Sequence, residues 1–411
     1  MKERKKIKIA VIGGGAAGLT AAIKCAEKFG GRNVIILERQ MNIGQKLLST
    51  GNGRCNISNK NVSPEHYHGD RNIINSVLSG FSYKASKKFF AGMGILFRED
   101  GEGRAYPYSN QAYTVLDCML AQLDRLGVAR LCSFKIDSIS KNCDFFDISS
   151  VNMTIRAEYV IFACGSAAYP SLGANMSGFD LLKNSGIPQP RLFPALAPIE
   201  TKEKYSILKG VRAKGVVSMY ADNKLITEKQ GEIQFSDKWL SGICVFDISR
   251  TVNEYLIYKK AHDIKLSIDL MPEYAENDLW IYLKKCKVLF SDEKASALLS
   301  GALNKNLAHA IASYAGIQDK LCKTLSGNDM KDLINAVKAF TFTPVYSENF
   351  NSAQVCAGGY GSDTVNPETL MSKKTNKLFI CGEMLDADGE CGGFNLHFAF
   401  GSAMKPAKYI K

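Results

Sequence analysis

Three glycines near the start of the 411-residue chain, Gly13, Gly15 and Gly18, have the spacing G-x-G-x-x-G, and Glu38 follows the last of them by twenty residues. In this pattern the first glycine permits a tight turn, the second lets the backbone approach a pyrophosphate, and the third lets a helix pack closely on a strand. An acidic residue at that distance accepts hydrogen bonds from a ribose. These residue types therefore predict a site for the phosphates and a ribose of a dinucleotide.

Strand and helix signals surround these residues. Residues 7–12 (IKIAVI) are an apolar run of strand length, and residues 19–29 carry apolar side chains at helical spacing. Residues 34–37 are a second apolar run, which ends directly before Glu38. A helix that begins at a glycine turn directs free N–H groups and the positive end of its dipole toward phosphates. We therefore favour a dinucleotide site over an ordinary βαβ unit with a glycine-rich turn.

The last sixty residues contain a second strand–loop–helix pattern. Residues 377–381 (KLFIC) are predicted as a buried strand, and a helix is predicted from about residue 396 to residue 405. The loop between them opens with Gly-Glu and closes with Gly-Gly. The N-terminal motif accounts for the adenosine end of a cofactor, and this return would enclose a second, larger ring system. A domain for NAD alone does not need such a return, so FAD fits better.

Two further stretches are predicted to face the cofactor. Residues 40–59 are rich in Gly, Asn and Ser and carry the cations Lys46 and Arg54, which is typical of a loop folded against a polar group. Residues 159–163 (YVIFA) are predicted as a buried strand that runs into a small-residue turn. A separate β-meander is predicted just before it, with strands at 128–139, 145–149 and 153–155.

Composition is that of an ordinary soluble globular protein, with 46% hydrophobic and 22% charged residues. The basic N-terminus runs directly into the phosphate motif and no long uncharged apolar run is present, so we expect neither a signal peptide nor a membrane helix. Twelve scattered cysteines then predict reduced thiols in a cytoplasm. The net charge of +12 is spread along the chain, and anionic cofactors or solubility explain it as well as nucleic acid or lipid does.

Other reactive side chains give weaker signals. His66 and His68 lack a third or fourth ligand at metal spacing, so we expect a solvated loop and no metal site. Cys55 and Cys391 both lie in stretches predicted to face the cofactor, and two structural thiols are favoured over a redox-active pair.

Domain organisation changes at a cluster of four prolines between residues 188 and 198. Short strands are predicted at 215–221, 231–235 and 243–248, a helical pattern follows, and residues 340–345 look like a returning strand. The predicted fold class is α/β. We expect an FAD-binding Rossmann-like domain from residues 1–193 and 348–411, an inserted β domain from 194–271 and 338–347, and a helical subdomain from 272–337.

Several blocks of the sequence resemble a known family. They are GGGAAGL (13–19), KLLSTGNGRCNISN (46–59), ACGSAAYPSLG (163–173), CAGGYG (356–361), NPETLMSKK (366–374) and GEMLDADGECGGFNLHFAFGSA (382–403). Together they resemble, over essentially the whole chain, the bacterial flavoproteins known as NAD(P)/FAD-dependent oxidoreductases, BaiN-like proteins or aminoacetone oxidase-like proteins. The resemblance implies non-covalent FAD, redox chemistry, an FAD domain built from both chain ends, an inserted β-barrel-like domain and a small helical domain.

The resemblance also implies which residues hold the cofactor. Contacts to the pyrophosphate and the adenosine ribose are expected from Gly13, Gly15, Ala16, Ala17, Gly18 and Glu38. The loop beside the diphosphate and the ring would contain Arg39, Gln45, Lys46, Asn52, Gly53, Arg54, Cys55 and Asn56, and the central turn Ala163, Gly165 and Tyr169. The ribityl chain and the pyrimidine edge of the flavin would be met by Gly382, Glu383, Asp386, Gly393, Phe394, Asn395 and Leu396.

No catalytic acid or base is assigned, and His397 and Tyr169 are the weak candidates. On an apolar helix such as LHFAF a histidine is more often packed and hydrogen-bonded than reactive.

The favoured function is hydride transfer from NAD(P)H through flavin to a small, largely apolar substrate of enone, steroid or bile-acid type. One alternative is a flavin amine oxidase of the aminoacetone oxidase type, and a second is a flavoprotein that binds or acts on RNA. No second nucleotide motif is present, so NAD(P)H would dock transiently, nucleic acid is not the expected partner, and the oligomeric state is not predicted.

Overall fold

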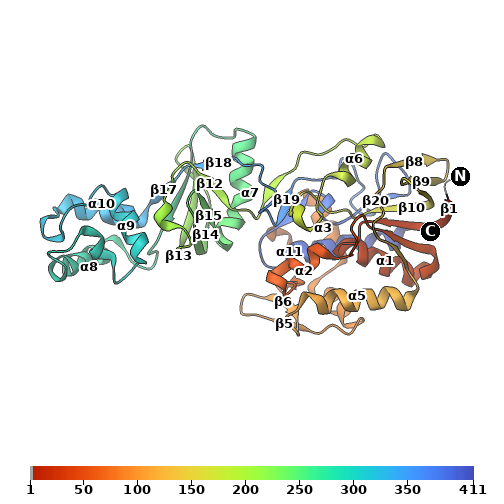
Figure 1. Ribbon diagram of the computed structural model, residues 1–411, viewed down its shortest axis with the longest axis horizontal. Coiled ribbons are helices and arrows are strands. Elements are labelled where there is room, and N and C mark those ends of the chain that lie inside the picture. Colours follow the sequence, from red (N-terminus) through yellow and green to blue (C-terminus); the bar gives the residue numbers. More distant parts are fainter. Residues whose placement is uncertain (1–2) are drawn as a thin grey trace. The chain divides into compact units, whose positions relative to one another are not determined.

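The computed structural model describes residues 3–411 and divides the chain into two compact units (Figure 1). Unit 1 comprises Met1–Phe193 and Phe350–Lys411, and unit 2 comprises Pro194–Asn349. Both ends of the chain therefore belong to unit 1, and unit 2 is inserted between them. Each unit has its own hydrophobic core.

A mixed sheet forms the centre of unit 1. Its parallel strands lie in the order β7-β2-β1-β10, and β20 pairs with the carboxyl half of β10. The bounds of these strands are β1 Glu3–Ile12, β2 Val34–Leu37, β7 Ala129–Leu131, β10 Met153–Phe162 and β20 Leu378–Ile380. All residues of β2 and β20 are buried, as expected for parallel strands covered on both faces.

The meander predicted before this sheet is part of it. The sequence predicts separate strands at 153–155 and 159–163, but β10 runs unbroken and pairs with β1 along its length. β10 also pairs antiparallel with β9 (Phe145–Ser149), and β9 pairs with β8 (Ser138–Asn142). The prediction was wrong because Arg156 and Glu158 interrupt the apolar pattern. Both charges are met by neighbours: the Arg156 guanidinium lies 2.7 Å from the Asp147 carboxylate, and Glu158 lies 3.2 Å from the Lys377 ammonium.

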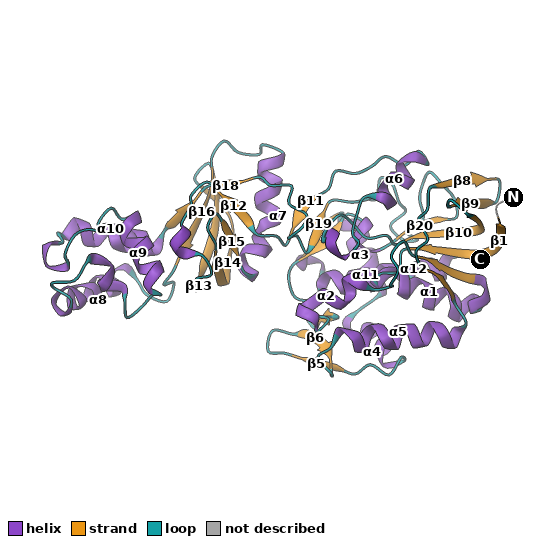
Figure 2. Cartoon of the chain, in the orientation of Figure 1, coloured by secondary structure: helices purple, strands orange, loops and turns teal. Residues whose placement is uncertain are grey.

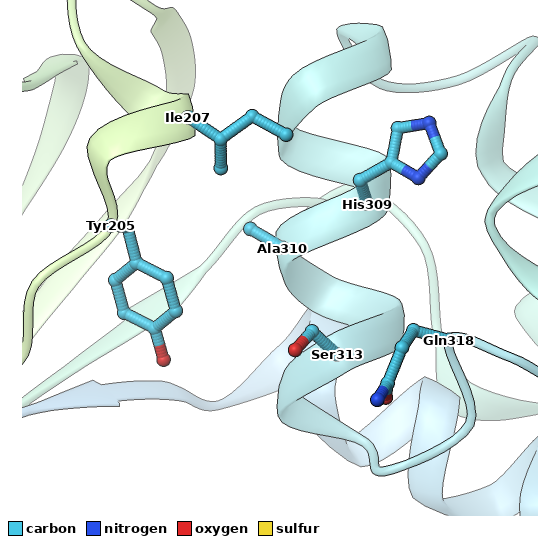
Figure 3. A pocket seen from close by; sticks show the side chains of 6 residues that line it. All are labelled: Tyr205, Ile207, His309, Ala310, Ser313 and Gln318. Carbon is cyan, nitrogen blue, oxygen red and sulfur yellow. The ribbon is translucent and has the colours of Figure 1, made fainter.

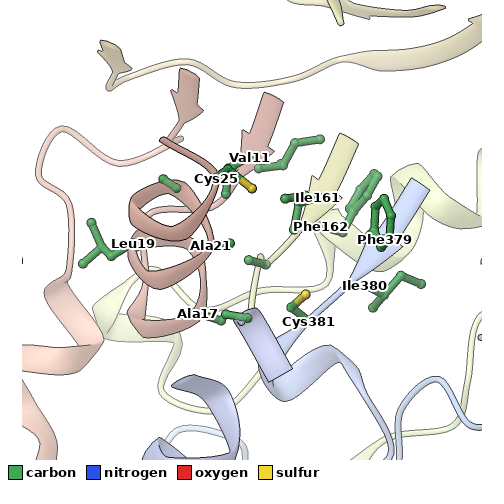
Figure 4. Packing of buried hydrophobic residues seen from close by; sticks show 14 of the residues in the cluster. Val11, Ala17, Leu19, Ala21, Cys25, Ile161, Phe162, Phe379, Ile380 and Cys381 are labelled. Atoms are coloured by element: carbon green, nitrogen blue, oxygen red, sulfur yellow. The ribbon is translucent and has the colours of Figure 1, made fainter. Parts of the chain in front are cut away.

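Helices and two small sheets complete unit 1 (Figure 2). The helices are α1 Ala16–Phe29, α2 Gln45–Gly53, α3 Arg71–Gly80, α4 Tyr83–Ala91, α5 Ala112–Leu126, α6 Ser177–Asn184, α11 Phe394–Ala403 and α12 Lys405–Tyr409. The small sheets are β3-β6-β5 (Ser58–Asn59, Arg104–Pro107, Phe97–Glu99) and β4-β21 (Tyr67–Gly69, Ala387–Gly389), and β19 covers Val355–Ala357. Small side chains of α1, among them Ala17 and Ala21, lie in the cluster that also contains residues of β10 and β20, which lets the helix approach the sheet closely (Figure 4).

The sheet of unit 2 curls toward a barrel. Its strand order is β17-β16-β13-β14-β15-β12-β18, so β17 and β18 lie at opposite ends. Only Thr343 separates these two strands in sequence, and two residue steps span about 7 Å. A flat sheet of this many strands would be about 29 Å wide, so its ends must come together. The bounds are β12 Ile199–Thr201, β13 Arg212–Ala221, β14 Lys224–Phe235, β15 Trp239–Ser241, β16 Ile264–Asp269, β17 Phe340–Phe342 and β18 Pro344–Val345, while β11 (Phe193–Ala195) spans the unit boundary.

One predicted strand of unit 2 is a helix. Residues 243–248 (ICVFDI) begin α7 (Ile243–Ile257), whose buried residues include Val245, Ile248 and Val252. Those positions follow the helical period, which a six-residue apolar run is too short to reveal. The other helices are α8 Glu276–Leu289, α9 Lys305–Tyr314 and α10 Gly327–Lys338. Over residues 3–411, no helix is long and apolar enough to cross a bilayer.

Candidate functional site

The turn between β1 and α1 has no room for side chains at two of its glycines. Gly13 has a φ of 101°, and a Cβ there would lie 2.4 Å from the backbone oxygen of Ala163. A Cβ on Gly18 would lie 1.9 Å from the backbone oxygen of Gly13. Gly15, by contrast, has no atom within 4 Å of its Cβ position. The first and third glycines therefore serve packing, and the second leaves open space at the helix N-terminus, where phosphates bind in such turns.

Glu38 lies directly against this glycine turn. Its Oε2 accepts a hydrogen bond of 2.6 Å from the Gly14 N–H, and its Oε1 accepts one of 2.7 Å from the Gln40 N–H. Two backbone donors hold the carboxylate in place, and each oxygen keeps a further lone pair that a ribose hydroxyl can use. The neighbouring Arg39 is exposed, and its guanidinium donates to the Gly173 carbonyl at 3.2 Å.

The segment after β2 contains the helix α2, which begins at Gln45 and is kinked. Gly51 and Asn52 have φ near +57°, in the left-handed region, inside what is otherwise a short helix. The exposed residues Asn52, Gly53 and Arg54 follow from this kink. The left-handed conformation turns the chain sharply and leaves this loop tip uncovered.

Cys55 and Asn56 follow the loop tip and are buried. Burial raises the pKa of the Cys55 thiol to about 12, so the group is a neutral thiol at physiological pH. The side-chain oxygen of Asn56 is buried and has no hydrogen-bond partner among the described residues. A buried acceptor without a donor costs about 1–3 kcal/mol, so this atom is suited to receive an N–H or O–H of a bound group.

An ion pair joins this loop to the C-terminal part of the chain. The Lys46 ammonium lies 2.7 Å from Oε2 of Glu383, with 29% and 20% of the two side chains exposed. Oε1 of Glu383 accepts a 3.1 Å hydrogen bond from the Cys356 N–H at the start of the glycine-rich turn. Glu383 thus connects its own turn with α2 and with β19.

The Gly-Glu turn also lies against the first turn of α1. A Cβ on Gly382, whose φ is 70°, would lie 2.8 Å from the side chain of Ala17. The Gly382 N–H donates to the hydroxyl of Ser402 at 2.9 Å. Further along, the Asp386 N–H donates to the Tyr360 carbonyl, which ties this segment to the glycine-rich turn. The N-terminal motif and the C-terminal loop therefore form one structure.

The Gly-Gly turn before α11 packs on the loop after Cys55. Gly393 has a φ of 96°, and a Cβ there would lie 2.4 Å from the Ser58 carbonyl oxygen and 2.6 Å from the orphaned oxygen of Asn56. Asn395 donates to the Gly389 carbonyl at 2.7 Å and accepts from the Gly389 N–H at 2.8 Å. These contacts hold the start of α11, with Phe394 buried and Leu396 half-buried.

The turn after β10 is the third loop of the site. Ala163 is buried against Gly13, and Gly165, with a φ of 72°, has open space at its Cβ position. Tyr169 has a φ of 67°, and its N–H donates to the Phe350 carbonyl at 3.1 Å. Tyr169 thus adopts the left-handed conformation directly before the short helical turn that begins at Pro170.

Strand register brings these loops to one edge of the sheet. Ile12 of β1 pairs with both Leu37 of β2 and Phe162 of β10, and Phe162 pairs with Ile380 of β20. Because the four strands are parallel, the loops that follow them begin side by side, and ligands of such sheets bind outside this edge. All residues predicted to hold the cofactor lie in unit 1, in these loops and in the two segments that pack against them.

The arrangement fits a dinucleotide with a large second ring. Open space at Gly15 and Gly165 leaves backbone uncovered at the carboxyl edge of the sheet, and Lys46 and Arg54 supply positive charge. The orphaned Asn56 oxygen lies where the C-terminal turn meets the loop. Within the described chain, no group of three or more His, Cys, Asp or Glu residues is placed to hold a metal ion.

His397 lies in the core with both ring nitrogens occupied. Nε2 is 2.7 Å from the Phe81 carbonyl oxygen and must donate to it, and burial lowers the pKa of the imidazole to about 4. The neutral ring therefore accepts through Nδ1 from the Ser58 hydroxyl, also at 2.7 Å. These contacts favour a packed histidine over a proton donor. Tyr169 is half-buried beside the central turn, and its catalytic role stays a prediction.

His66 packs against Phe394, one of the residues predicted to hold the cofactor, whereas the sequence predicts a solvated loop at His66. Its Nδ1 lies 2.7 Å from the Glu390 carboxylate, and its ring stacks on Phe394 with a centroid separation of 4.5 Å. Next to it, the buried Tyr67 hydroxyl donates to the Phe394 carbonyl at 2.9 Å. These contacts join residues more than three hundred positions apart, so no local sequence pattern predicts them.

Unit 2 contains a pocket of about 370 Å³, which shares no residue with these loops (Figure 3). It lies between the turn after β12 and α9 and is lined by Tyr205, Ile207, His309, Ala310, Ser313 and Gln318. Its lining combines apolar and polar side chains and includes no Asp, Glu, Lys or Arg.

A profile of one protein family, described as the HI0933-like protein Rossmann domain, matches residues 7–409. The chain belongs to the HI0933-like family. The match covers nearly the whole chain and confirms the predicted resemblance and the Rossmann-type FAD-binding fold. As a member of this family the protein is a flavoprotein, an FAD-dependent oxidoreductase.

Relatives of this HI0933-like protein carry the names of enzymes. The 3-dehydro-bile acid delta(4,6)-reductase of Clostridium scindens is 34% identical over 400 residues, which cover 96% of each chain. The ribosomal RNA dihydrouridine synthase of Haemophilus influenzae is 24% identical over 401 residues, again 96% of each chain. A solved quinol-fumarate reductase with menaquinol molecules is 12% identical, covers 99% of this chain and 71% of its own, and has a TM-score of 0.51, which concerns the fold alone.

Proposed function

We propose that this protein catalyses NAD(P)H-linked reduction of a carbon–carbon double bond conjugated with a carbonyl, in a small, largely apolar substrate of steroid or bile-acid type. The observation that supports this most is the full-length relative at 34% identity, whose name denotes reduction of a 3-oxo bile acid at its 4,6-double bonds. The more distant relative is named for making dihydrouridine, which also requires reduction of a carbon–carbon double bond next to a carbonyl. The two names share a reaction type although their substrates differ.

In this proposal the loops at the sheet edge hold FAD, which supplies hydride transfer when bound. The N-terminus of α1 and the open backbone at Gly15 bind the diphosphate, and Glu38 binds the adenosine ribose. Lys46, held by Glu383, places a positive charge beside the phosphates. Backbone N–H groups at the start of α11, with the positive end of that helix, favour negative charge at the pyrimidine edge of the ring. The remaining predicted contacts keep the roles given above.

The domain roles are also proposals. We assign cofactor binding to residues 1–193 and 348–411, and we assign the inserted β domain (194–271 and 338–347) and the helical subdomain (272–337) to shaping access for the substrate. Binding of the nicotinamide donor is proposed as transient, since the sequence contains one dinucleotide motif.

A second candidate is reduction of uridine in RNA. It is favoured by the relative named as a ribosomal RNA dihydrouridine synthase and by the net charge of +12, which suits a polyanionic partner. The identity of that relative is lower, so we place this candidate second. An RNA affinity that falls steeply with salt would favour it.

The proposal is tested by product analysis under anaerobic conditions. The holoprotein is mixed with NADPH or NADH and a 3-oxo-4-ene steroid acid, and the products are examined by mass spectrometry. We expect a product heavier by two hydrogens that requires the nicotinamide donor. Unchanged steroid with both donors, together with oxygen consumption on aminoacetone, would instead favour the amine oxidase alternative.

A further inference from the structure

β5 and β6 form an antiparallel hairpin in unit 1 (Figure 2). Arg98 is directly opposite Tyr106, and the Tyr108 N–H donates to the Leu96 carbonyl at 2.8 Å. Since side chains alternate along strands, Leu96, Arg98, Tyr106 and Tyr108 share this face. Leu96 is 67% exposed and Tyr108 is 61% exposed, which is unusual for an apolar and an aromatic side chain lying side by side.

Two arginines lie on the two tyrosine rings of this face. The guanidinium carbon of Arg98 is 4.3 Å from the ring centroid of Tyr108, and that of Arg54 is 4.8 Å from the ring of Tyr106. The tyrosines are two residues apart, so the stacked pairs are separated by about 7 Å. A guanidinium that lies over a ring can still bind an anion in bidentate geometry through its edge N–H groups. Arg54 already uses one of these groups, since its Nε–H donates to the Gly51 carbonyl at 3.1 Å.

These two arginines have no carboxylate partner among the described residues, whereas the carboxylates of the same hairpin are engaged. Glu99 accepts from the Tyr83 hydroxyl at 2.7 Å, and Asp100 and Glu102 lie 2.7 Å and 2.9 Å from the Arg104 guanidinium. The exposed face therefore carries a local excess of positive charge next to apolar surface, although acidic residues are close in sequence.

We propose that this face, formed by Leu96, Arg98, Tyr108 and the Arg54–Tyr106 pair, binds a flat apolar molecule that ends in a carboxylate. The inference rests on the proposed function. It adds that an arginine side chain binds the anionic end of the steroid-type substrate. Leu96 and Tyr108 contact the apolar body, and the Arg98 guanidinium binds the carboxylate. Arg54 belongs to the loop predicted to lie beside FAD, so the face begins at the cofactor loop.

A run of nucleotides fits this face less well than an amphipathic acid. Single-stranded nucleic acid binds by stacking successive bases on exposed rings. Here Tyr106 is 7% exposed beneath Arg54, which leaves Tyr108 as the exposed ring of the two, and Leu96 offers no stacking surface. Apolar contact beside a cation is what a steroid acid requires.

The test compares two probes that differ by one charge. The FAD-loaded protein is titrated with 3-oxochol-4-enoic acid and with its methyl ester, and binding is followed by isothermal calorimetry as well as by turnover. We expect the wild-type protein to bind the acid about fivefold more tightly than the ester, since exposed charge pairs contribute about 1 kcal/mol at most. Arg98→Gln should bring this ratio close to one. Lys84→Gln removes the same charge from an exposed position on α4 and should leave the ratio unchanged.

Each outcome separates the inference from the proposed function. If the wild-type protein reduces both probes and binds them with equal affinity, the inference is refuted and the proposed reductase function stands. This comparison needs no variant. Failure of the wild type to bind or reduce either probe would refute the proposed substrate class and the inference with it. Oligouridylate binding that is lost in Arg98→Gln, with the steroid ratio unchanged, would overturn the inference in favour of RNA.

Discussion

Replacing Gly15 by alanine separates cofactor binding from folding, because the structure gives its side chain open space. Gly15 has a φ of −81°, which alanine adopts without strain, and no atom lies within 4 Å of its Cβ position. The lower entropy of the unfolded chain contributes about 0.4–1 kcal/mol of stability. The poorer capping by alanine at this N-cap removes a similar amount. We therefore expect the unfolding free energy of the apoprotein to change by less than about 0.5 kcal/mol.

The same methyl group should weaken FAD binding strongly. It occupies the space through which a diphosphate approaches the helix N-terminus, and a retreat of the phosphates should lower the affinity by at least about tenfold, which corresponds to about 1.4 kcal/mol. Urea unfolding of the apoprotein and a titration with FAD, followed by flavin fluorescence, measure the two quantities separately. FAD binding of wild-type strength by Gly15→Ala would refute this placement of the diphosphate.

Gly13→Ala is the matched control. Its φ of 101° costs alanine about 1–2 kcal/mol, and the contact of 2.4 Å with the Ala163 oxygen adds about 1–3 kcal/mol. This variant should therefore lose roughly 2–5 kcal/mol of stability even without FAD. Equal stabilities of the two apo variants would contradict the geometry of the turn.

Three further predictions concern other groups of unit 1. The His397 pKa of about 4 lies below its ordinary value of 6.5, so the stability that the neutral ring contributes is present above pH 6.5 and is lost as the pH falls to 4. In urea unfolding, the wild type should lose up to about 3 kcal/mol of unfolding free energy over this pH range for this reason, and His397→Gln should not show this loss. Cys55 is a buried thiol with a pKa of about 12, so Cys55→Ser should leave the count of rapidly titrated thiols unchanged, and loss of one fast thiol would argue for a reactive pair. A double-mutant cycle on Lys46 and Glu383 should give a coupling of about 0.5–1 kcal/mol in urea unfolding, and a value near zero would mean that the pair does not form in solution.

The sequence predicts the β1–α1–β2 motif well because its signals are local. The glycine spacing, the apolar runs and the acid at the end of β2 lie within forty residues, and the structure places Glu38 against the glycine turn. The C-terminal strand β20 and helix α11 are also predicted from their own residues. That this domain binds FAD is inferred from the glycine pattern and from the family. The contacts of individual residues with FAD stay predictions.

Other features depend on partners that are distant in sequence. The helix α7 begins with an apolar run that is too short to distinguish a helix from a strand, and its buried stripe becomes visible only over two turns. The charges of Arg156 and Glu158 interrupt the apolar pattern of β10, so the sequence does not show that the strand is continuous. The strand accommodates both charges because Asp147 and Lys377, which are distant in sequence or in another strand, pair with them. The pairing of His66 with Glu390 and the arginine–tyrosine stacks have no local signal at all.

The most direct test of the reductase proposal is the reductive half-reaction. The yellow holoprotein is mixed with NADH and, separately, with NADPH in an anaerobic stopped-flow instrument, and the visible flavin absorbance is followed. We predict rapid bleaching with at least one donor and a rate that saturates with donor concentration. Full retention of the flavin absorbance with both donors would contradict an NAD(P)H-linked reductase.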